Sequence, residues 1–312
     1  MTEYLISNFF MFLFYSIIFL LGLAVGSFLN VVIFRMESGD KIINDRSKCL
    51  KCKHILAWYD LLPVLSFIFL RGRCRYCGES ISIQYPLIEL ATGALFVLIT
   101  NYELQIADYE HLISQFPDAP ISISYLLFIA SSLIVMFVYD LRHYIIPDKV
   151  IYPAIIVALG YNLYSEIIIN NFQFSIFNFS AQGGPALGWQ SISNFQFLIY
   201  NLRNSFFINH LFAAFLAGGF FFSIVWLTKG KGMGGGDVKL AFLMGLVLGW
   251  PVIIVSVFLS FIIGSIFGIS LIIAGKKKMK SMIPFGPFLI FGTFVGLFWG
   301  EKIVKWYFGL MD

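Results

Sequence analysis

Charged residues are scarce in this chain of 312 amino acids, where Asp, Glu, Lys and Arg together make up 12% of the sequence. A soluble globular protein carries about 25% charged residues, so a water-facing surface of ordinary polarity is excluded. With 59% hydrophobic residues and a mean hydropathy of +0.85, the chain is expected to be an integral membrane protein. Its apolar runs are continuous and do not alternate with polar residues, which favours helices over a membrane β-barrel.

Basic residues are absent from the N-terminal segment, where the first Lys or Arg is Arg35. The basic region of a secretory signal peptide is therefore missing, and the apolar run over 8–34 is also too long for one. We expect this run to be a retained first helix. The sequence also lacks the His-Glu-x-x-His motif of zinc proteases and the phosphate-binding loop of nucleotide hydrolases. No nucleic-acid partner is expected.

Apolar runs near the bilayer length of about 20 residues predict the membrane spans. They lie at 8–34, 84–100, 121–139, 150–169, 207–228, 251–274 and 284–300, with a shorter run at 240–250. Counting 240–250 as an eighth crossing puts every basic loop on one side, and the positive-inside rule makes that side the cytoplasm. Residues 35–75 alone hold nine Lys and Arg, whereas 101–120 hold none. The insert at 170–206 is expected to be an external loop.

The sequence therefore predicts an all-α membrane protein of about eight helices with a small cytoplasmic domain between the first two. Its parts are the first helix over 1–34, a loop over 35–84 and a membrane domain over 85–312.

All four cysteines lie in that loop as two Cys-x-x-Cys pairs, Cys49 with Cys52 and Cys74 with Cys77. Two such pairs in a reducing compartment are typical of a closed tetrahedral Zn²⁺ site, with Zn–S bonds of about 2.3 Å. Unligated or redox-active cysteine is the alternative. The apolar run Leu61–Leu70 between the pairs is too short to span the bilayer. It is expected either to form the core of the small domain or to lie on the membrane.

The stretch Gly232-Met-Gly-Gly-Gly-Asp237-Val-Lys239 is the predicted centre of function. Glycines at this density indicate close approach of another backbone, and a carboxylate at the edge of an apolar segment is costly unless it has a use. Asp140 lies at the end of the third span, and it is predicted at the same cytoplasmic edge of the membrane as Asp237. Two carboxylates that meet share one proton, so one can activate water while the other protonates a leaving nitrogen. Helix capping is the alternative role for Asp237, and it is the expected role for Asp148.

Several segments, taken in order, resemble the type IV prepilin peptidases, membrane aspartyl proteases with a Gly-x-Gly-Asp motif. The matching segments are Gly22-Leu-Ala-Val-Gly26-Ser-Phe-Leu-Asn-Val-Val-Ile-Phe-Arg35, Trp58 to Cys77, Ile81 to Glu89, Asp140 with Ile146-Pro147-Asp148, Gly232 to Leu240, and Pro284-Phe-Gly-Pro287. This resemblance implies that Asp140 and Asp237 are the catalytic pair, with Gly232, Gly234, Gly236 and Lys239 binding or supporting the substrate.

The resemblance further implies cleavage of the short basic leader of type IV prepilins or pseudopilins, on the cytoplasmic side of a bacterial inner membrane. It implies N-methylation of the new N-terminus with S-adenosylmethionine, with Gly72 and Glu89 as candidate residues. Leu50, where the family often has proline, weakens the case for methylation.

Two other functions fit parts of the pattern. Tyr139-Asp140 with Gly234-Gly-Gly236-Asp237 is also similar to presenilin and signal-peptide-peptidase enzymes, although their Pro-Ala-Leu element is replaced here by Pro284-Phe-Gly-Pro287. A transporter or assembly subunit with a zinc-stabilised loop, whose aspartates bind protons or cations, is the alternative that is not an enzyme.

Overall fold

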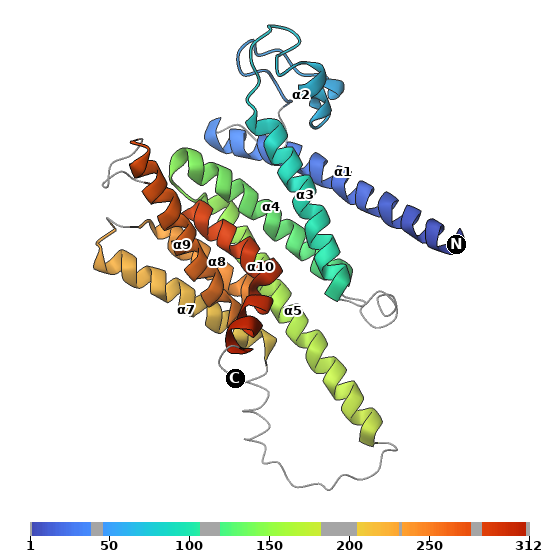
Figure 1. Ribbon diagram of the computed structural model, residues 1–312, viewed down its shortest axis with the longest axis vertical. Helices are drawn as coiled ribbons and strands as arrows, with labels where there is room; N and C mark the ends of the chain where they lie inside the picture. Colours follow the sequence, from blue (N-terminus) through green and yellow to red (C-terminus); the bar gives the residue numbers. More distant parts are fainter. Residues whose placement is uncertain are drawn as a thin grey trace. The chain divides into compact units, whose positions relative to one another are not determined.

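The computed structural model describes residues 2–38, 46–106, 119–181, 205–230, 233–275 and 283–309, and all regular elements in these ranges are helices (Figure 1). The long helices are α1 (Thr2–Ser38), α3 (Gln84–Ile106), α4 (Ala119–His143), α5 (Asp148–Ala181), α7 (Phe206–Leu227), α9 (Val252–Ile273) and α10 (Gly286–Gly309). The short ones are the 3-10 turn η1 (Trp58–Leu61), α2 (Leu65–Phe69) and α8 (Gly235–Leu248).

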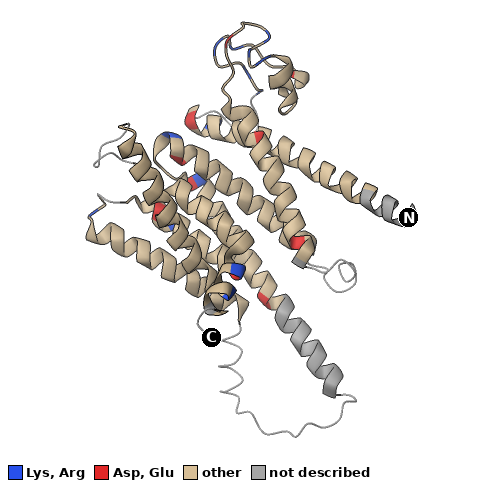
Figure 2. Cartoon of the chain, in the orientation of Figure 1, with Lys and Arg blue, Asp and Glu red and all other residues tan. Residues whose placement is uncertain are grey.

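Within the described ranges, seven helices are long and apolar enough to cross a membrane. They correspond to the seven long runs of the sequence, which confirms the predicted all-α membrane class. Figure 2 shows the charged residues gathered mainly near helix ends and in the loop between α1 and α3. Helix α8 covers the run at 240–250, but its 14 residues span only about 21 Å. That it crosses the bilayer stays a prediction.

The fourth span continues further than expected, because α5 extends to Ala181. The first part of the 170–206 insert is thus helical instead of a loop, and residues 182–204 lie outside the described ranges. The physical reason is visible in the sequence, where no glycine or proline interrupts the segment from 161 to 182.

The described helices divide into two compact units, Met1–Tyr139 and Asp140–Asp312. In the first, α1 and α3 pack closely because glycines remove side chains from their contact. A Cβ atom added to Gly22 would lie 2.7 Å from the Cα atom of Gly93, and one added to Gly26 would lie 2.7 Å from the Cα atom of Glu89. Small residues allow this approach, which is the usual way helices pack in lipid. The buried Asn30 amide donates to the Tyr85 carbonyl at 3.2 Å across the same contact.

In the second unit, glycines allow close helix packing at two further contacts. Gly245 of α8 lies directly against the backbone of Ala213 and Ala214 in α7. Three glycines of α10, spaced by four residues, face α9: Gly292 lies over Ser260, Gly296 over Ser256 and Gly300 over Val252. Helix α5 joins this group through the buried Asn162, whose amide donates to the Leu246 carbonyl of α8 at 2.9 Å. Helix α8, which carries Asp237, is therefore held from several sides.

We expect Gly245→Ala to destabilise the protein by about 1–3 kcal/mol, the usual cost of overpacking, because the new Cβ atom would overlap the α7 backbone. Thermal unfolding in detergent measures the effect. The matched control is Gly219→Ala in α7, where the added Cβ meets no atom within 4 Å, and it should leave stability equal or higher. Equal unfolding temperatures for the Gly245 variant and the wild type would contradict this packing.

Candidate active site and metal centre

Asp140 lies in the last turn of α4 and is buried, with 4% of its surface exposed. Its Oδ2 atom is buried and has no hydrogen-bond partner in the described part of the chain. The carboxylate lies against the backbone at Gly286, where an added Cβ atom would stand 2.5 Å from Asp140 Oδ2. Glycine is thus required in the first turn of α10 because the Asp140 carboxylate fills the space a side chain would need.

Asp237 lies in the first turn of α8, and its Oδ2 atom accepts a hydrogen bond from the backbone N–H of Gly234 at 3.2 Å. Gly234 is the N-terminal cap of this helix. The capping role considered for Asp237 is therefore real. It uses one of the two carboxylate oxygens and leaves acceptor capacity for a second partner. A carboxylate at a helix N-terminus also lies at the positive end of the helix dipole.

Ile146 brings the two aspartate segments together. A Cβ atom added to Gly236 would lie 3.1 Å from Ile146 Cβ, and one added to Gly286 would lie 3.5 Å from Ile146 Cδ1. Gly236 directly precedes Asp237, and the Asp140 carboxylate lies against the backbone of Gly286. One isoleucine thus contacts both glycines and brings the Asp140 and Asp237 segments side by side. That the two carboxylates act as a pair stays a prediction.

The glycines of the motif differ in their surroundings. The close approach predicted for them occurs at Gly236, but the neighbour is Ile146 of the same chain. An added Cβ atom at Gly235 would meet nothing within 4 Å. Gly232 lies outside the described residues.

Lys239 forms an ion pair that the sequence did not indicate. Its Nζ atom lies 2.6 Å from Asp148 Oδ1 and 4.9 Å from the centre of the Tyr152 ring. Asp148, expected to cap a helix, is the first residue of α5. Lys239 follows Asp237 by two positions on α8. The pair therefore ties the start of α8, which carries Asp237, to the start of α5.

The four cysteines converge in the loop between α1 and α3. The Sγ atoms of Cys49, Cys52, Cys74 and Cys77 all lie within 4.8 Å of one another, and those of Cys49 and Cys77 are 3.9 Å apart. Tetrahedral Zn–S bonds of about 2.3 Å place sulfur atoms about 3.8 Å apart, so the four thiols fit one zinc ion. Burial raises the pKa of the Cys49 thiol, but hydrogen bonds from the backbone of Cys52 and Lys51 outweigh this and lower that pKa to about 7. A backbone hydrogen bond at Glu79 lowers the pKa of the Cys77 thiol, but burial and hydrogen bonds with the other three cysteines outweigh this and raise that pKa to about 11. The fit to zinc therefore rests on the positions of the four sulfur atoms.

The two cysteine pairs have the same local fold. The N–H groups of Cys49 and Cys74 donate to the carbonyls of His54 and Glu79, five residues later, at 2.9 and 2.8 Å. Each turn has a residue at positive φ four positions after its first cysteine, Lys53 at 58° and Gly78 at 72°. Gly78 thus forms the turn of the second pair.

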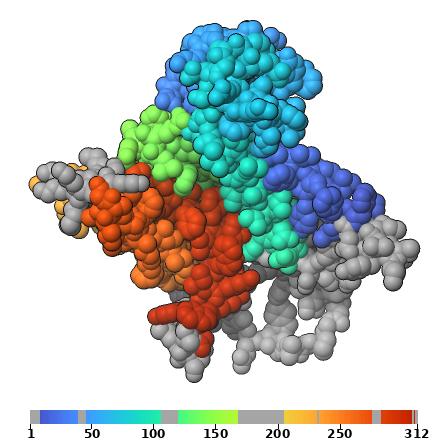
Figure 3. Space-filling model, turned by 45° about the horizontal axis from the view of Figure 1, so that its top comes forward, coloured from blue at the N-terminus to red at the C-terminus, as the bar shows by residue number. Residues whose placement is uncertain are grey.

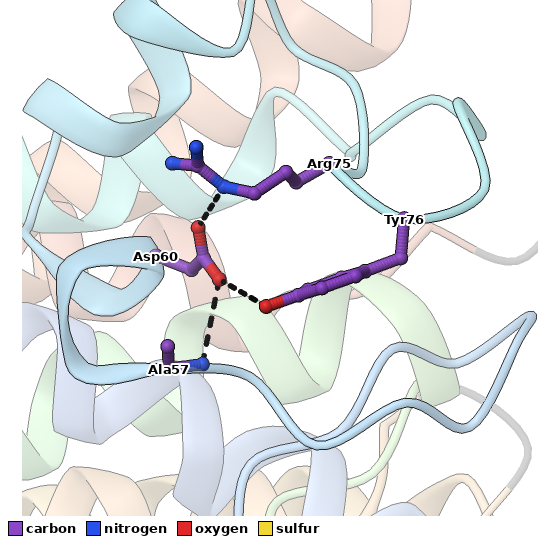
Figure 4. Close-up of polar contacts among 4 residues, drawn as sticks. All are labelled: Ala57, Asp60, Arg75 and Tyr76. Carbon is purple, nitrogen blue, oxygen red and sulfur yellow. Dashed lines mark hydrogen bonds and ion pairs between the residues drawn. The ribbon is translucent and has the colours of Figure 1, made fainter.

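Asp60 holds the two halves of this loop together (Figure 4). Its Oδ1 atom accepts a hydrogen bond from Arg75 Nε at 2.8 Å, and its Oδ2 atom accepts longer ones from Tyr76 Oη and the Ala57 N–H. Arg75 and Tyr76 stand between Cys74 and Cys77, so this buried carboxylate fixes the second pair. The hydrogen bond from Arg75 to Asp60 raises the pKa of the Arg75 guanidinium. A role for Asp60 was not predicted, although an acid between two basic cysteine pairs was a signal present in the sequence.

The two residues singled out for methyl transfer serve the architecture of the same loop. Glu89 is buried in α3, and its Oε2 atom accepts a hydrogen bond from the Val64 N–H at 2.7 Å. Gly72 lies three residues after the end of α2, at a φ of 67°, with the Phe67 ring lying over it. Glu89 therefore fixes the start of α2 against α3, and Gly72 shapes the turn that follows α2.

Two family models match the chain, one after the other. The Bacterial Peptidase A24 N-terminal domain matches residues 20–102, which include the cysteine loop. The Type IV leader peptidase family matches residues 127–269, which include both aspartates. No solved structure matches the chain.

Two of three curated relatives match almost end to end, and the third matches about half of the chain. The prepilin leader peptidase/N-methyltransferase of Aeromonas salmonicida is 28% identical over 95% of this chain and 94% of its own length. The protein of the same name from Bacillus subtilis is 28% identical over 94% of this chain and 97% of its own length. That of Myxococcus xanthus is 38% identical over 51% of this chain and 44% of its own. With both domains of the family present in order and seven helices that can cross a membrane, the chain is an integral membrane peptidase that belongs to the type IV leader peptidase family.

Proposed function

We propose that this peptidase removes the basic leader of type IV prepilins and pseudopilins on the cytoplasmic side of the bacterial inner membrane, with Asp140 and Asp237 as its catalytic pair. The observation that carries the proposal is the convergence of the two aspartate segments on Ile146 inside the unit that the peptidase family model matches. The names of the relatives support prepilins as substrates. The nine Lys and Arg of residues 35–75 support a cytoplasmic position of that loop.

The proposed chemistry needs only the two carboxylates and a water molecule. The ionised carboxyl of the pair takes a proton from water as the water oxygen attacks the scissile carbonyl carbon. The protonated carboxyl then gives its proton to the amide nitrogen as the C–N bond breaks. Two carboxyls at one site in low dielectric cannot both ionise, which keeps one proton on the pair. The Gly234 N–H and the Gly286 backbone hold the two carboxylates in place before substrate arrives.

We propose N-methylation of the new N-terminus as a second activity, supported by the printed names of the relatives and by the intact cysteine loop. Glu89 and Gly72 are engaged with the loop backbone and the Phe67 ring, so in this proposal they act by shaping the loop. S-adenosylmethionine would supply the methyl group. Zinc, held by the four cysteines, would be structural, because all four coordination positions are filled by thiolates.

The first test is leader removal from a coexpressed prepilin, followed on a gel. We expect Asp140→Asn and Asp237→Asn each to lower processing by a factor of about 10²–10⁴, the usual contribution of general acid–base catalysis. The control is Glu301→Gln on α10, an exposed carboxylate paired only with Lys305 in the described residues, which should process normally. Processing by the membrane-inserted Asp140→Asn variant at the wild-type rate would refute the pair.

The ion pair between Lys239 and Asp148 gives a second test. If Lys239 positions α8, Lys239→Gln should lower kcat by a factor of about 1.4 to 5, the range expected for an exposed pair worth about 0.2–1 kcal/mol. The charge-swapped double variant, Lys239→Asp with Asp148→Lys, should recover most of that loss. If Lys239 instead binds substrate, Lys239→Gln will raise KM, and the swap will not rescue it.

Metal analysis tests the cysteine centre independently of activity. We expect one zinc ion per purified chain by elemental analysis, and its loss in Cys74→Ser, because Cys74 is the buried member of the set. Limited proteolysis of the loop should accelerate in the same variant. Leu50→Ala, at an exposed position between Cys49 and Cys52, should retain the metal. A wild-type protein purified without chelators that holds no zinc would rule out this centre.

A further inference from the structure

The loop between α1 and α3 exposes several large apolar side chains on the neighbouring elements η1 and α2. The most exposed are Trp58 at 76%, Leu65 at 51%, Ile68 at 61% and Phe69 at 80%. Leu65, Ile68 and Phe69 are spaced by three and four residues, so they lie on one side of α2. Phe67 points elsewhere, over Gly72. We call Trp58, Leu65, Ile68 and Phe69 the apolar face.

A hydrogen bond fixes the depth of this face along α3. The N–H of Val64, the residue before α2, donates to Glu89 Oε2 at 2.7 Å. Glu89 lies five residues after Gln84, where the candidate membrane span begins, which is about 7–8 Å along the helix axis. The start of α2 is therefore held beside the second turn of a membrane-spanning helix. Figure 3 shows the loop and the start of α3 as one continuous body.

The charges around the face suit an anionic lipid surface. Residues 46–83 contain seven Lys and Arg against only Asp60 and Glu79. Arg71 and Arg73 follow α2 directly, and both are exposed. An apolar surface with an exposed Trp and flanking Arg is the pattern of segments that lie in the headgroup region, where cations near the surface are attracted to anionic lipids.

We propose that the apolar face inserts into the lipid interface of the membrane that α1 and α3 cross, with Arg71 and Arg73 bound to phosphates of anionic phospholipids. The proposal rests on three observations: the exposure of the face, its depth set by the Val64–Glu89 hydrogen bond, and the adjacent basic residues. It selects the membrane from the two positions that the sequence left open for the run Leu61–Leu70. Docking of this loop would hold the cysteine centre at the membrane surface.

The test measures the contact of Trp58 with lipid in the full-length, zinc-loaded protein. Trp58 is kept as the single tryptophan by replacing the other five with phenylalanine. The probe is quenching of its fluorescence by phospholipids brominated in the upper acyl chain, in vesicles of phosphatidylcholine with or without phosphatidylglycerol. Iodide in the aqueous phase is the opposite probe. If the variant with five tryptophans replaced does not fold, the difference in quenching between wild type and Trp58→Phe gives the quenching of Trp58.

The proposal predicts that brominated lipid quenches Trp58 while iodide does not. Ile68→Ser with Phe69→Ser should lose most of the lipid quenching, whereas Leu50→Ser, an exposed apolar residue outside the face, should not change it. Arg71→Gln with Arg73→Gln should remove the extra quenching that phosphatidylglycerol gives. Retained zinc shows that the loop is still folded in each variant.

Quenching by iodide alone would overturn the proposal, because the face would then lie in water. Quenching by neither probe would also overturn it, since the face would then be covered by protein. Relief of lipid quenching by an added prepilin would assign the face to substrate instead of lipid.

Discussion

The buried carboxylate of Asp140 is the constraint on which the second unit depends. A carboxylate in an apolar, membrane-embedded environment is costly, and it persists where the surrounding backbone leaves room for it. Here the room exists because Gly286 has no side chain, and the adjacent Ile146 contacts Gly236 as well. The positions of α8 and α10 relative to the end of α4 thus follow from close contacts at two glycines. Because the same contacts bring the segments of Asp140 and Asp237 together, the packing of these helices determines where the proposed catalytic pair lies.

Close approach through small residues recurs wherever the helices meet. It occurs between α1 and α3, between α7 and α8, and between α9 and α10, at Gly22, Gly245 and Gly296 among others. In lipid there is no hydrophobic drive between helices, so such contacts and a few buried hydrogen bonds, such as that of Asn162, supply the specificity. The cysteine loop follows other rules. Its stability depends on four thiols, on the Asp60 network and on the hydrogen bond to Glu89.

The sequence predicted the helical spans and the four-cysteine cluster, and it singled out two aspartates whose catalytic role stays a prediction, because each of these has a local signal. The length of an apolar run predicts a membrane span, and two Cys-x-x-Cys pairs predict a metal site. An acid beside an apolar run indicates a position where burial of the charge is unfavourable. The contacts that hold the site were not predictable in the same way. The ion pair of Lys239 with Asp148 joins residues 91 positions apart, and the role of Ile146 depends on tertiary packing. The extension of α5 to Ala181 was missed because span length was taken as helix length, although nothing in the segment ends a helix.

The central claim is that Asp140 and Asp237 act together on one peptide bond, and binding of a transition-state analogue tests it most directly. The analogue is a prepilin leader peptide whose scissile amide is replaced by a non-cleavable tetrahedral hydroxyl group. For wild type, Asp140→Asn and Asp237→Asn, the Kd of this analogue is compared with the Kd of the corresponding substrate peptide that retains the scissile amide. Because catalysis is differential binding of the transition state, we predict that wild type prefers the analogue by a factor of about 10² or more and that each substitution removes this preference. An unchanged preference in either variant would contradict the account.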